Sequence, residues 1–387
     1  MRILMSLTYY RPHISGLTIY VERLSRELAA RGHFITVLTS QHDSSLPREE
    51  WLDGVRIVRC PVTVTLRKGP IMPRFAAIAA RLVQQHDLVS VHLPQAESVL
   101  VVGAAKALRK PSVLTYHCDL ELSAGSLNSI LNRAVATTGR VTGRLVDAVV
   151  AYTEDYASHS AFLQEYVQKL RVIPPPVTIG NPSDSEIQGF RNRYAVSPGP
   201  VLGFASRLAT EKGIEFAIDA LPGLIEQYPR LQVLFAGPYL DVVGEQHYWR
   251  RLEPVIRELG DRWRFLGTLS QEELPAFYGS LDLLLMTSIN STESFGLVQV
   301  ESMLCGTPVV ATDLPGVRQP VRMTGMGEVV GIADKDSLAG GIRKILANRD
   351  QYVIARHEIE QIFSLRQTVD SYENLYQSLI SRKGRQP

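Results

Sequence analysis

Short apolar runs alternate with longer amphipathic segments along almost the whole chain. A buried strand of a parallel sheet reads as a short apolar run, whereas a helix that packs on the sheet is apolar on one face only. The alternation therefore predicts repeated strand–helix units and an α/β fold with parallel sheets. The predicted strands are 2–7, 35–39, 55–59, 88–92, 112–117, 148–152 and 170–173 in the first half, and 201–205, 232–236, 263–266, 281–286 and 307–311 in the second.

A Pro/Gly-rich segment, 174–183, interrupts this alternation between the two halves and is expected to hold the hinge. The chain of 387 residues is long enough for two domains, each with its own core. We therefore predict two Rossmann-like, doubly wound parallel-sheet domains, at 1–178 and 190–362. The residues alone leave open which domain the final helix, near 367–381, packs against.

Composition and charge narrow the class of function. Hydrophobic residues make up 45% of the chain and charged residues 21%, which is typical of a globular protein. Lys and Arg (41) barely exceed Asp and Glu (39), so the overall charge does not favour a nucleic acid as partner. Cys60, Cys118 and Cys305 are too widely spaced for a C-x-x-C metal site or a disulfide framework, which indicates a reducing, cytoplasmic compartment.

Hydropathy argues against a membrane span. The apolar run at residues 1–7 is too short for a signal-peptide core and is predicted to be the first strand. No segment approaches the roughly 20 apolar residues that a spanning helix requires. We expect a cytoplasmic protein that at most touches a membrane from its inner face.

The most informative segment is 293–301, in which Glu293 and Glu301 flank seven other residues between two predicted strands. It is expected to open a helix, and the main chain of Phe295, Gly296 and Leu297 would then offer unpaired N–H groups to a phosphate. In one continuous helix the two carboxylates would lie roughly 12 Å apart along the axis, comparable to the span from a sugar to a nucleotide ribose. The alternative is a pair of solvated helix carboxylates.

Two cations, Arg207 and Lys212, follow the predicted strand 201–205. Loops at the carboxyl ends of strands are where open α/β sheets bind ligands, and two cations there can neutralise a diphosphate. The alternative is a pair of solvated surface charges, with Glu211 pairing with Arg207.

In the first half, His117 closes the predicted strand 112–117, and Gly16 lies in the loop after the first strand. An imidazole at a strand end can hydrogen-bond a sugar hydroxyl, but it can equally be a satisfied core histidine. Gly16 permits close approach of a phosphate and is otherwise an ordinary turn glycine. Neither half carries G-x-G-x-x-G at its first strand exit, which disfavours a nicotinamide-dependent oxidoreductase.

These features resemble, in order as well as in kind, the retaining GT-B glycosyltransferases usually called family 4. The family pattern is a glycine loop after the first strand, a histidine after a later strand, an Arg and a Lys five residues apart, and E-x7-E. The matching residues here are Gly16, His117, Arg207 with Lys212, and Glu293 with Glu301. The resemblance continues through segments 204–208, 265–267 and 306–310, and its architecture covers nearly the whole chain.

The resemblance implies how a nucleotide-sugar donor would be held. Gly16 would contact its distal phosphate, and Arg207 and Lys212 would clamp the diphosphate. The main chain of segment 294–297, that is Ser294, Phe295, Gly296 and Leu297, would add donors. GDP-mannose or a UDP-sugar would be the substrate, with no cofactor and no metal.

The resemblance also implies the chemistry. Glu293 would bind hydroxyls of the transferred sugar, Glu301 would bind the ribose, and main-chain groups near 265–269 would meet the base. His117 would lie beside the sugar, so that His117, Glu293, Arg207 and Lys212 form the implied catalytic set. Transfer would retain the anomeric configuration. The N-terminal domain would bind the acceptor and would be joined by the C-terminal helix, 365–387.

Two departures from the family pattern stand out. The first loop has Ser15-Gly16 where many relatives have Pro-Gly-Gly, and the interdomain strand leads into Pro174-Pro-Pro-Val177 rather than Pro-Asn-Gly-Val. Two other functions fit the same architecture, namely a sugar-nucleotide epimerase and a catalytically degenerate partner subunit. An epimerase needs an acid/base constellation that has no evident place here, and a degenerate subunit would be expected to lack Glu293 or Lys212.

The acceptor leaves only a weak trace in the sequence. Arg133, Arg140 and Arg144 share one face of a predicted helix that also carries Ile130, Ala134, Val141 and Leu145. Such a face favours a lipid-linked acceptor and a peripheral membrane contact, which Arg67, Lys68 and Arg74 would extend. The alternative is a soluble helix packed normally on the sheet. A glycan or a small molecule therefore stays open as the acceptor.

Overall fold

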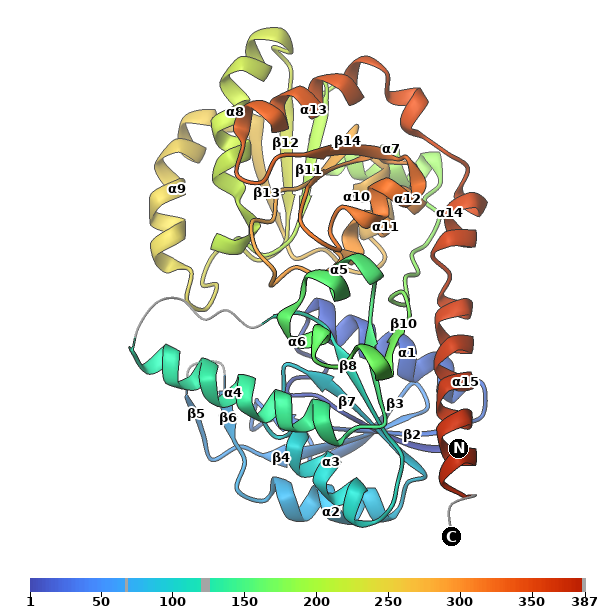
Figure 1. Ribbon diagram of the computed structural model, residues 1–387. Coiled ribbons are helices and arrows are strands. Elements are labelled where there is room, and N and C mark those ends of the chain that lie inside the picture. Colours follow the sequence, from blue (N-terminus) through green and yellow to red (C-terminus); the bar gives the residue numbers. More distant parts are fainter. Residues whose placement is uncertain (67–68, 120–125, 385–387) are drawn as a thin grey trace. The chain divides into compact units, whose positions relative to one another are not determined.

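The computed structural model describes residues 1–66, 69–119 and 126–384. The chain divides into two compact units, the first made of Met1–Pro176 with Leu365–Pro387 and the second of Val177–Ser364. Each unit has its own parallel sheet and its own helices (Figure 1). The division falls within the Pro/Gly-rich segment 174–183, and the final helix groups with the N-terminal residues.

The sheet of the first unit has eight strands in the order β10-β9-β8-β7-β1-β2-β4-β3. All neighbours are parallel except β3 and β4, as the alternating pattern predicts. The edge strand β3 and the small hairpin of β5 and β6 were not predicted, because they are short and mostly exposed and so lack an apolar run. The strands are β1 (Arg2–Ser6), β2 (Phe34–Gln41), β3 (Glu49–Leu52), β4 (Val55–Pro61), β5 (Val64–Leu66), β6 (Gly69–Ile71), β7 (Leu88–Leu93), β8 (Ser112–Tyr116), β9 (Ala148–Ala151) and β10 (Leu170–Val172).

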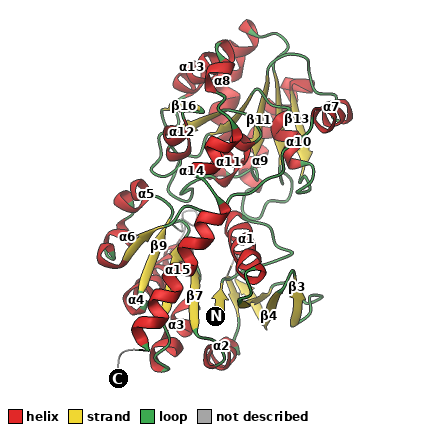
Figure 2. Cartoon of the chain, turned by 90° about the vertical axis from the view of Figure 1, so that its right-hand side faces the viewer, coloured by secondary structure: helices red, strands yellow, loops and turns green. Residues whose placement is uncertain are grey.

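Helices cover both faces of this sheet. Because side chains alternate along a strand, Val89 and Val91 of β7 join the core under α2 and α3, while Ser90 points to the opposite face. Helices α1 and α15 pack against each other on that face (Figure 2). The helices of the unit are α1 (Gly16–Ala30), α2 (Phe75–Gln84), α3 (Ser98–Ala107), α4 (Ser126–Leu145), α5 (Glu154–His159), α6 (Ala161–Gln164), η1 (Val167–Lys169) and α15 (Leu365–Lys383).

Helix α15 is fastened to the first unit by buried hydroxyl groups. The hydroxyl of Tyr372 lies 2.6 Å from that of Tyr20 in α1 and 2.9 Å from that of Thr115 in β8. The hydroxyl of Tyr376 donates to Ser90 of β7 at 3.1 Å. Residues at both ends of the sequence therefore complete one core.

The sheet of the second unit has six parallel strands in the order β13-β12-β11-β14-β15-β16. Five of them match the predicted strands closely. The sixth, β16, was missed because its four residues, Gly-Glu-Val-Val, include a glycine and a charge and so resemble a loop. The strands are β11 (Val201–Ala205), β12 (Gln232–Ala236), β13 (Trp263–Gly267), β14 (Leu283–Met286), β15 (Val309–Thr312) and β16 (Gly327–Val330).

Helices α8, α9 and α13 share one apolar core with the second sheet, to which they contribute Leu221, Leu252 and Ile342. Because every strand is parallel, all carboxyl ends meet at one edge, and the loops that leave this edge carry Arg207, Lys212 and Glu293. The helices of the unit are α7 (Asp184–Arg193), η2 (Thr210–Lys212), α8 (Ile214–Gln227), α9 (Gln246–Leu259), η3 (Gly260–Arg262), α10 (Leu274–Gly279), α11 (Leu297–Leu304), α12 (Gln319–Thr324), α13 (Lys335–Ala347), η4 (Arg349–Tyr352) and α14 (Arg356–Ile362).

Candidate functional site

The loop after β11 is tied to the loop after β14 by two hydrogen bonds. Ile289 N donates to the carbonyl of Glu211 at 3.0 Å, and the hydroxyl of Thr287 donates to the carbonyl of Lys212 at 2.6 Å. Gly213 follows in the left-handed conformation (φ 59°), where a Cβ would lie 2.5 Å from the carbonyl oxygen of Thr287. This close approach fixes Lys212 beside the segment that contains Glu293.

Both predicted cations are paired with carboxylates. Lys212 Nζ lies 2.5 Å from Glu293 Oε2, and each of these side chains is 18% exposed. Arg207, whose side chain is more exposed, pairs with Glu211 four residues later in the same loop. The structure therefore joins Lys212 and Glu293, which are 81 positions apart in sequence, and it also contains the Arg207–Glu211 pair that the sequence offered as the alternative.

Segment 293–301 opens a helix, but later than expected. Helix α11 begins at Leu297, and Glu293, Ser294 and Phe295 precede it. Gly296, at φ 78°, turns the chain into the helix, and Phe295 is buried against the ring of Phe363 at 5.6 Å between centroids. The axial separation calculated for one continuous helix is therefore wrong, because only Glu301 is helical.

Glu301 is 5% exposed and accepts a hydrogen bond of 3.1 Å from the hydroxyl of Tyr278 in α10. Sequence reasoning missed Tyr278, since nothing in segment 274–279 distinguishes a tyrosine that supports a carboxylate from one that fills the core. Ser294, at 4% exposure, is also buried. A buried carboxylate held by a tyrosine is rigid, which suits it to bind a hydroxyl pair in a fixed position.

In the first unit, Gly16 is the first residue of α1, and the side chain of Ser15 caps the helix by accepting from Thr18 N at 3.2 Å. A Cβ built on Gly16 meets nothing within 4 Å. The first turn of a helix leaves main-chain N–H groups without intrahelical partners, so this end of α1 presents donors beside open space. The structure alone does not require a glycine here.

Both ring nitrogens of His117 are hydrogen-bonded within the first unit. Nε2 lies 2.9 Å from Nδ1 of His92, and Nδ1 contacts the hydroxyl of Tyr152. Burial lowers the pKa of His117 and lowers the pKa of His92 to about 3. Both rings are therefore neutral at pH 7, and His117 binds a ligand through a ring nitrogen only if one partner gives way.

Sequence reasoning found His117 but neither of its partners. His92 lies within β7 and Tyr152 directly follows β9, and these strands flank β8 in the sheet. The register pairs His92 with Thr115, two residues before His117, and Thr115 with Val150, two residues before Tyr152. Polar side chains near one another on three neighbouring strands were the available signal, but they are recognised only once the strand order is known.

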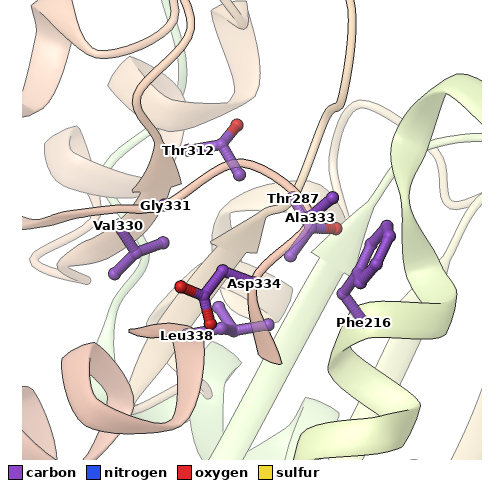
Figure 3. A pocket seen from close by; sticks show the side chains of 8 residues that line it. All are labelled: Phe216, Thr287, Thr312, Val330, Gly331, Ala333, Asp334 and Leu338. Atoms are coloured by element: carbon purple, nitrogen blue, oxygen red, sulfur yellow. The ribbon is translucent and has the colours of Figure 1, made fainter. Parts of the chain in front are cut away.

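A small pocket lies near the carboxyl ends of β14, β15 and β16, with Phe216 and Asp334 among the side chains around it (Figure 3). The carboxylate of Asp334 accepts from the main-chain N of Asp336 at 3.0 Å and of Ser337 at 2.9 Å, which caps α13. None of the predicted site residues lines this pocket. Its acidic side chain, Asp334, already serves as the cap of α13.

The basic face predicted on α4 is partly described. Arg133 and Arg144 are exposed, and Arg140 pairs with Glu165 at 2.9 Å. Arg67 and Lys68 lie outside the described residues, as do the side chains of Ile130 and Ala134. Among the helices of the described ranges, none is both long and apolar enough to cross a bilayer.

Two family models match the chain one after the other. The model described as Glycosyltransferase Family 4 matches residues 14–180, and the model described as Glycosyl transferases group 1 matches residues 189–361. The first match covers the first unit from residue 14 and extends four residues into the second, and the second match lies within the second unit. Together they account for most of the chain.

Similar proteins of known name are also glycosyltransferases. The D-inositol 3-phosphate glycosyltransferase of Geodermatophilus obscurus is 29% identical over 93% of this chain and 84% of its own. The 2-deoxystreptamine glucosyltransferase of Streptomyces kanamyceticus is 28% identical over 85% of this chain and 89% of its own. The phosphatidyl-myo-inositol mannosyltransferase of Mycobacterium leprae is 27% identical over 92% of this chain and 91% of its own.

Solved structures share the fold. HepE of Anabaena, in complex with UDP, matches with a TM-score of 0.78 and 23% identity, covering 98% of this chain and 100% of HepE. Sucrose-phosphate synthase from Thermosynechococcus elongatus matches with a TM-score of 0.77 and 22% identity, covering 98% and 99%. These likenesses confirm the predicted GT-B fold. Since both halves match glycosyltransferase models, the chain belongs to the group 1, family 4 glycosyltransferases.

Proposed function

We propose that the chain is a retaining hexosyltransferase that takes its sugar from GDP-mannose or a UDP-sugar and needs no metal ion. The second unit binds the donor through Arg207, Lys212, Glu293 and Glu301, with main-chain donors of segment 294–297. The first unit binds the acceptor and supplies Gly16 and His117.

The observation that carries the proposal is the contact of 2.5 Å between Lys212 Nζ and Glu293 Oε2. In a nucleotide sugar, the sugar is bonded directly to the diphosphate. A cation that holds the diphosphate and a carboxylate that accepts from sugar hydroxyls must therefore lie side by side. The pair has this arrangement, at the carboxyl edge of a parallel sheet where such ligands bind.

The reaction breaks the bond between the anomeric carbon and the diphosphate oxygen and forms one from that carbon to an acceptor oxygen. Negative charge develops on the departing diphosphate, and Arg207 and Lys212 neutralise it, the role that a metal ion has in other enzymes. The acceptor hydroxyl attacks from the face that the diphosphate leaves, so the configuration is retained. The acceptor proton passes to the diphosphate product or to solvent.

For the acceptor we propose a polyhydroxylated ring, either free or attached to a lipid. Similar proteins are named for D-inositol 3-phosphate, 2-deoxystreptamine and phosphatidyl-myo-inositol, which all carry a six-membered carbon ring with several substituents. A lipid-linked acceptor would place Arg133 and Arg144 of α4 against anionic headgroups, as a peripheral membrane contact.

A thermal-shift titration of the purified chain with GDP, UDP, ADP and their common sugar conjugates, with a chelator present, tests the donor proposal. A ligand that binds only the folded state at about 100 times its Kd stabilises it by about 2.7 kcal/mol. We expect stabilisation by one base in preference to the others. If none of these ligands raises the melting temperature of the folded protein, a nucleotide-sugar donor would be refuted.

Two variants test the assignment of residues. Glu301→Ala is expected to weaken nucleotide binding, and Lys212→Ala is expected to reduce kcat about 100-fold or more, since it removes a charge that stabilises the leaving group. Product formed on inositol, its phosphate, phosphatidylinositol or 2-deoxystreptamine would identify the acceptor. Unchanged kinetics in both variants would overturn the residue assignment but not the enzyme class.

A further inference from the structure

Two buried serine hydroxyls in the second unit have no hydrogen-bond partner. Ser206 directly follows β11, and Ser288 lies two residues beyond β14, the neighbouring strand. Ser288 is 1% exposed, and the Oγ atom of Ser206 is also buried. Among the described residues, neither oxygen is within hydrogen-bond reach of a suitable partner.

Other buried hydroxyls of the second unit are satisfied. Thr287 donates to the carbonyl of Lys212, Thr312 donates to the carbonyl of Ser288, and Ser280 donates to the carbonyl of Ala276, each at 2.6 Å. Buried polar atoms without a partner are uncommon and cost stability. Two of them at adjoining strand ends therefore call for a group that the protein alone does not supply.

Both serines line one small hollow, which we call the serine hollow, and Lys212 lines it with them. The other residues of its wall are Phe204, Ala205, Leu285, Met286 and Thr287. The polar residues among those that line it are Ser206, Thr287, Ser288 and Lys212, and none of the lining residues is acidic. The cavity volume is ≈ 10 Å³, room for one water-sized oxygen and no more.

We propose that the serine hollow receives one non-bridging oxygen of the donor diphosphate, which accepts hydrogen bonds from Ser206 and Ser288 beside the Lys212 charge. This inference rests on the proposed function and adds two residues to its donor site. A neutral hydroxyl donates strongly to an anionic oxygen, and the bond strengthens as charge develops on the leaving group. A phosphoryl oxygen is close to water in size, so the hollow fits the oxygen but excludes the rest of the phosphate.

The test compares Ser206→Ala and Ser288→Ala with wild type by calorimetric titration, using UDP, GDP and the corresponding nucleosides, and by thermal unfolding of the free protein. Loss of an unpartnered hydroxyl is expected to leave the melting temperature unchanged or raised. The Kd for the nucleoside diphosphate is expected to rise about tenfold in each variant, because a hydrogen bond to a charged group is lost. The Kd for the nucleoside should stay the same.

Ser280→Ala is the matched control, since Ser280 is as buried as Ser288 but has a protein partner. It should lower the melting temperature and leave both Kd values unchanged. Undiminished diphosphate affinity in Ser206→Ala and Ser288→Ala would overturn the inference, and the hollow would then hold water only. If wild type binds none of the nucleotides, the proposed function is itself refuted and this inference falls with it.

Discussion

Replacing Glu211 by glutamine removes the carboxylate that pairs with Arg207 in the loop after β11. We expect a diphosphate that binds Arg207 to displace this carboxylate, so that Glu211 competes with the donor. The Glu211→Gln variant should therefore bind nucleoside diphosphates more tightly than wild type.

The structure limits how large the effect can be. The side chain of Arg207 is 41% exposed and that of Glu211 is 17% exposed, so water weakens their attraction. Pairs of this kind contribute about 0.2–1 kcal/mol, which corresponds to a roughly 1.4- to 5-fold decrease in Kd when the competing carboxylate is lost. Because the pair is lost, the free energy of unfolding should fall by about the same small amount.

Calorimetric titration of both proteins with UDP and GDP at low salt measures this difference. Glu253→Gln is the matched control, because Glu253 pairs with Arg257 at the same spacing on α9, where no candidate site residue lies. The difference between Glu211→Gln and wild type should shrink at high salt, since screening weakens an exposed ion pair.

Two results would refute the reasoning. If Glu211→Gln binds the diphosphate less tightly than both wild type and Glu253→Gln, then Glu211 supports the donor instead of competing with it. An unchanged Kd would contradict it as well, because it would show that the diphosphate does not displace Glu211 from Arg207.

Three further perturbations test other parts of the structure. Gly16→Ala should leave the melting temperature unchanged, because a Cβ there meets nothing within 4 Å. It should nevertheless raise the Kd for nucleoside diphosphate. Equal affinity of the variant and wild type in calorimetry would remove Gly16 from the site. Tyr278→Phe deletes the donor to Glu301 and should weaken nucleotide binding by about 1 kcal/mol, so an identical titration would contradict that support. The folded rings of His92 and His117 stay neutral, whereas the same rings in the unfolded chain protonate below about pH 6.5. The free energy of unfolding should therefore have its full value above that pH. It should fall toward pH 3 by about 1.4 kcal/mol per ring and pH unit. Urea unfolding at pH 7.5 and 5 measures this, and an equal pH effect in His92→Asn would disprove it.

The parallel sheets could be predicted from the sequence because each buried strand is a short apolar run. Strands with little burial, such as β3 and β16, were not predicted. The exact start of α11 was not predicted either, since Gly296 turns the chain into the helix only after Glu293. A glycine next to a phenylalanine does not reveal in sequence that it has a positive φ.

The candidate site residues could be found from their order and spacing, but their contacts could not. Lys212 meets Glu293 because β14 pairs with β11 although β12 and β13 lie between them in sequence. The partners of His117 depend in the same way on the pairing of β7, β8 and β9. Such crossovers follow from the packing of the whole sheet, and a local pattern does not contain them.

The hydrogen bonds that the hydroxyl groups of Tyr372 and Tyr376 make have a consequence for folding during synthesis. The first unit is discontinuous, since α15 reaches its sheet only after the second unit has been synthesised, whereas the second unit is one continuous stretch, Val177–Ser364. On the ribosome, the half that carries Arg207, Lys212 and Glu293 can therefore finish folding first. Until α15 emerges, the face of the N-terminal sheet that α1 and α15 cover together is only partly covered, and during that interval this sheet is the part of the nascent chain most exposed to aggregation and chaperone binding.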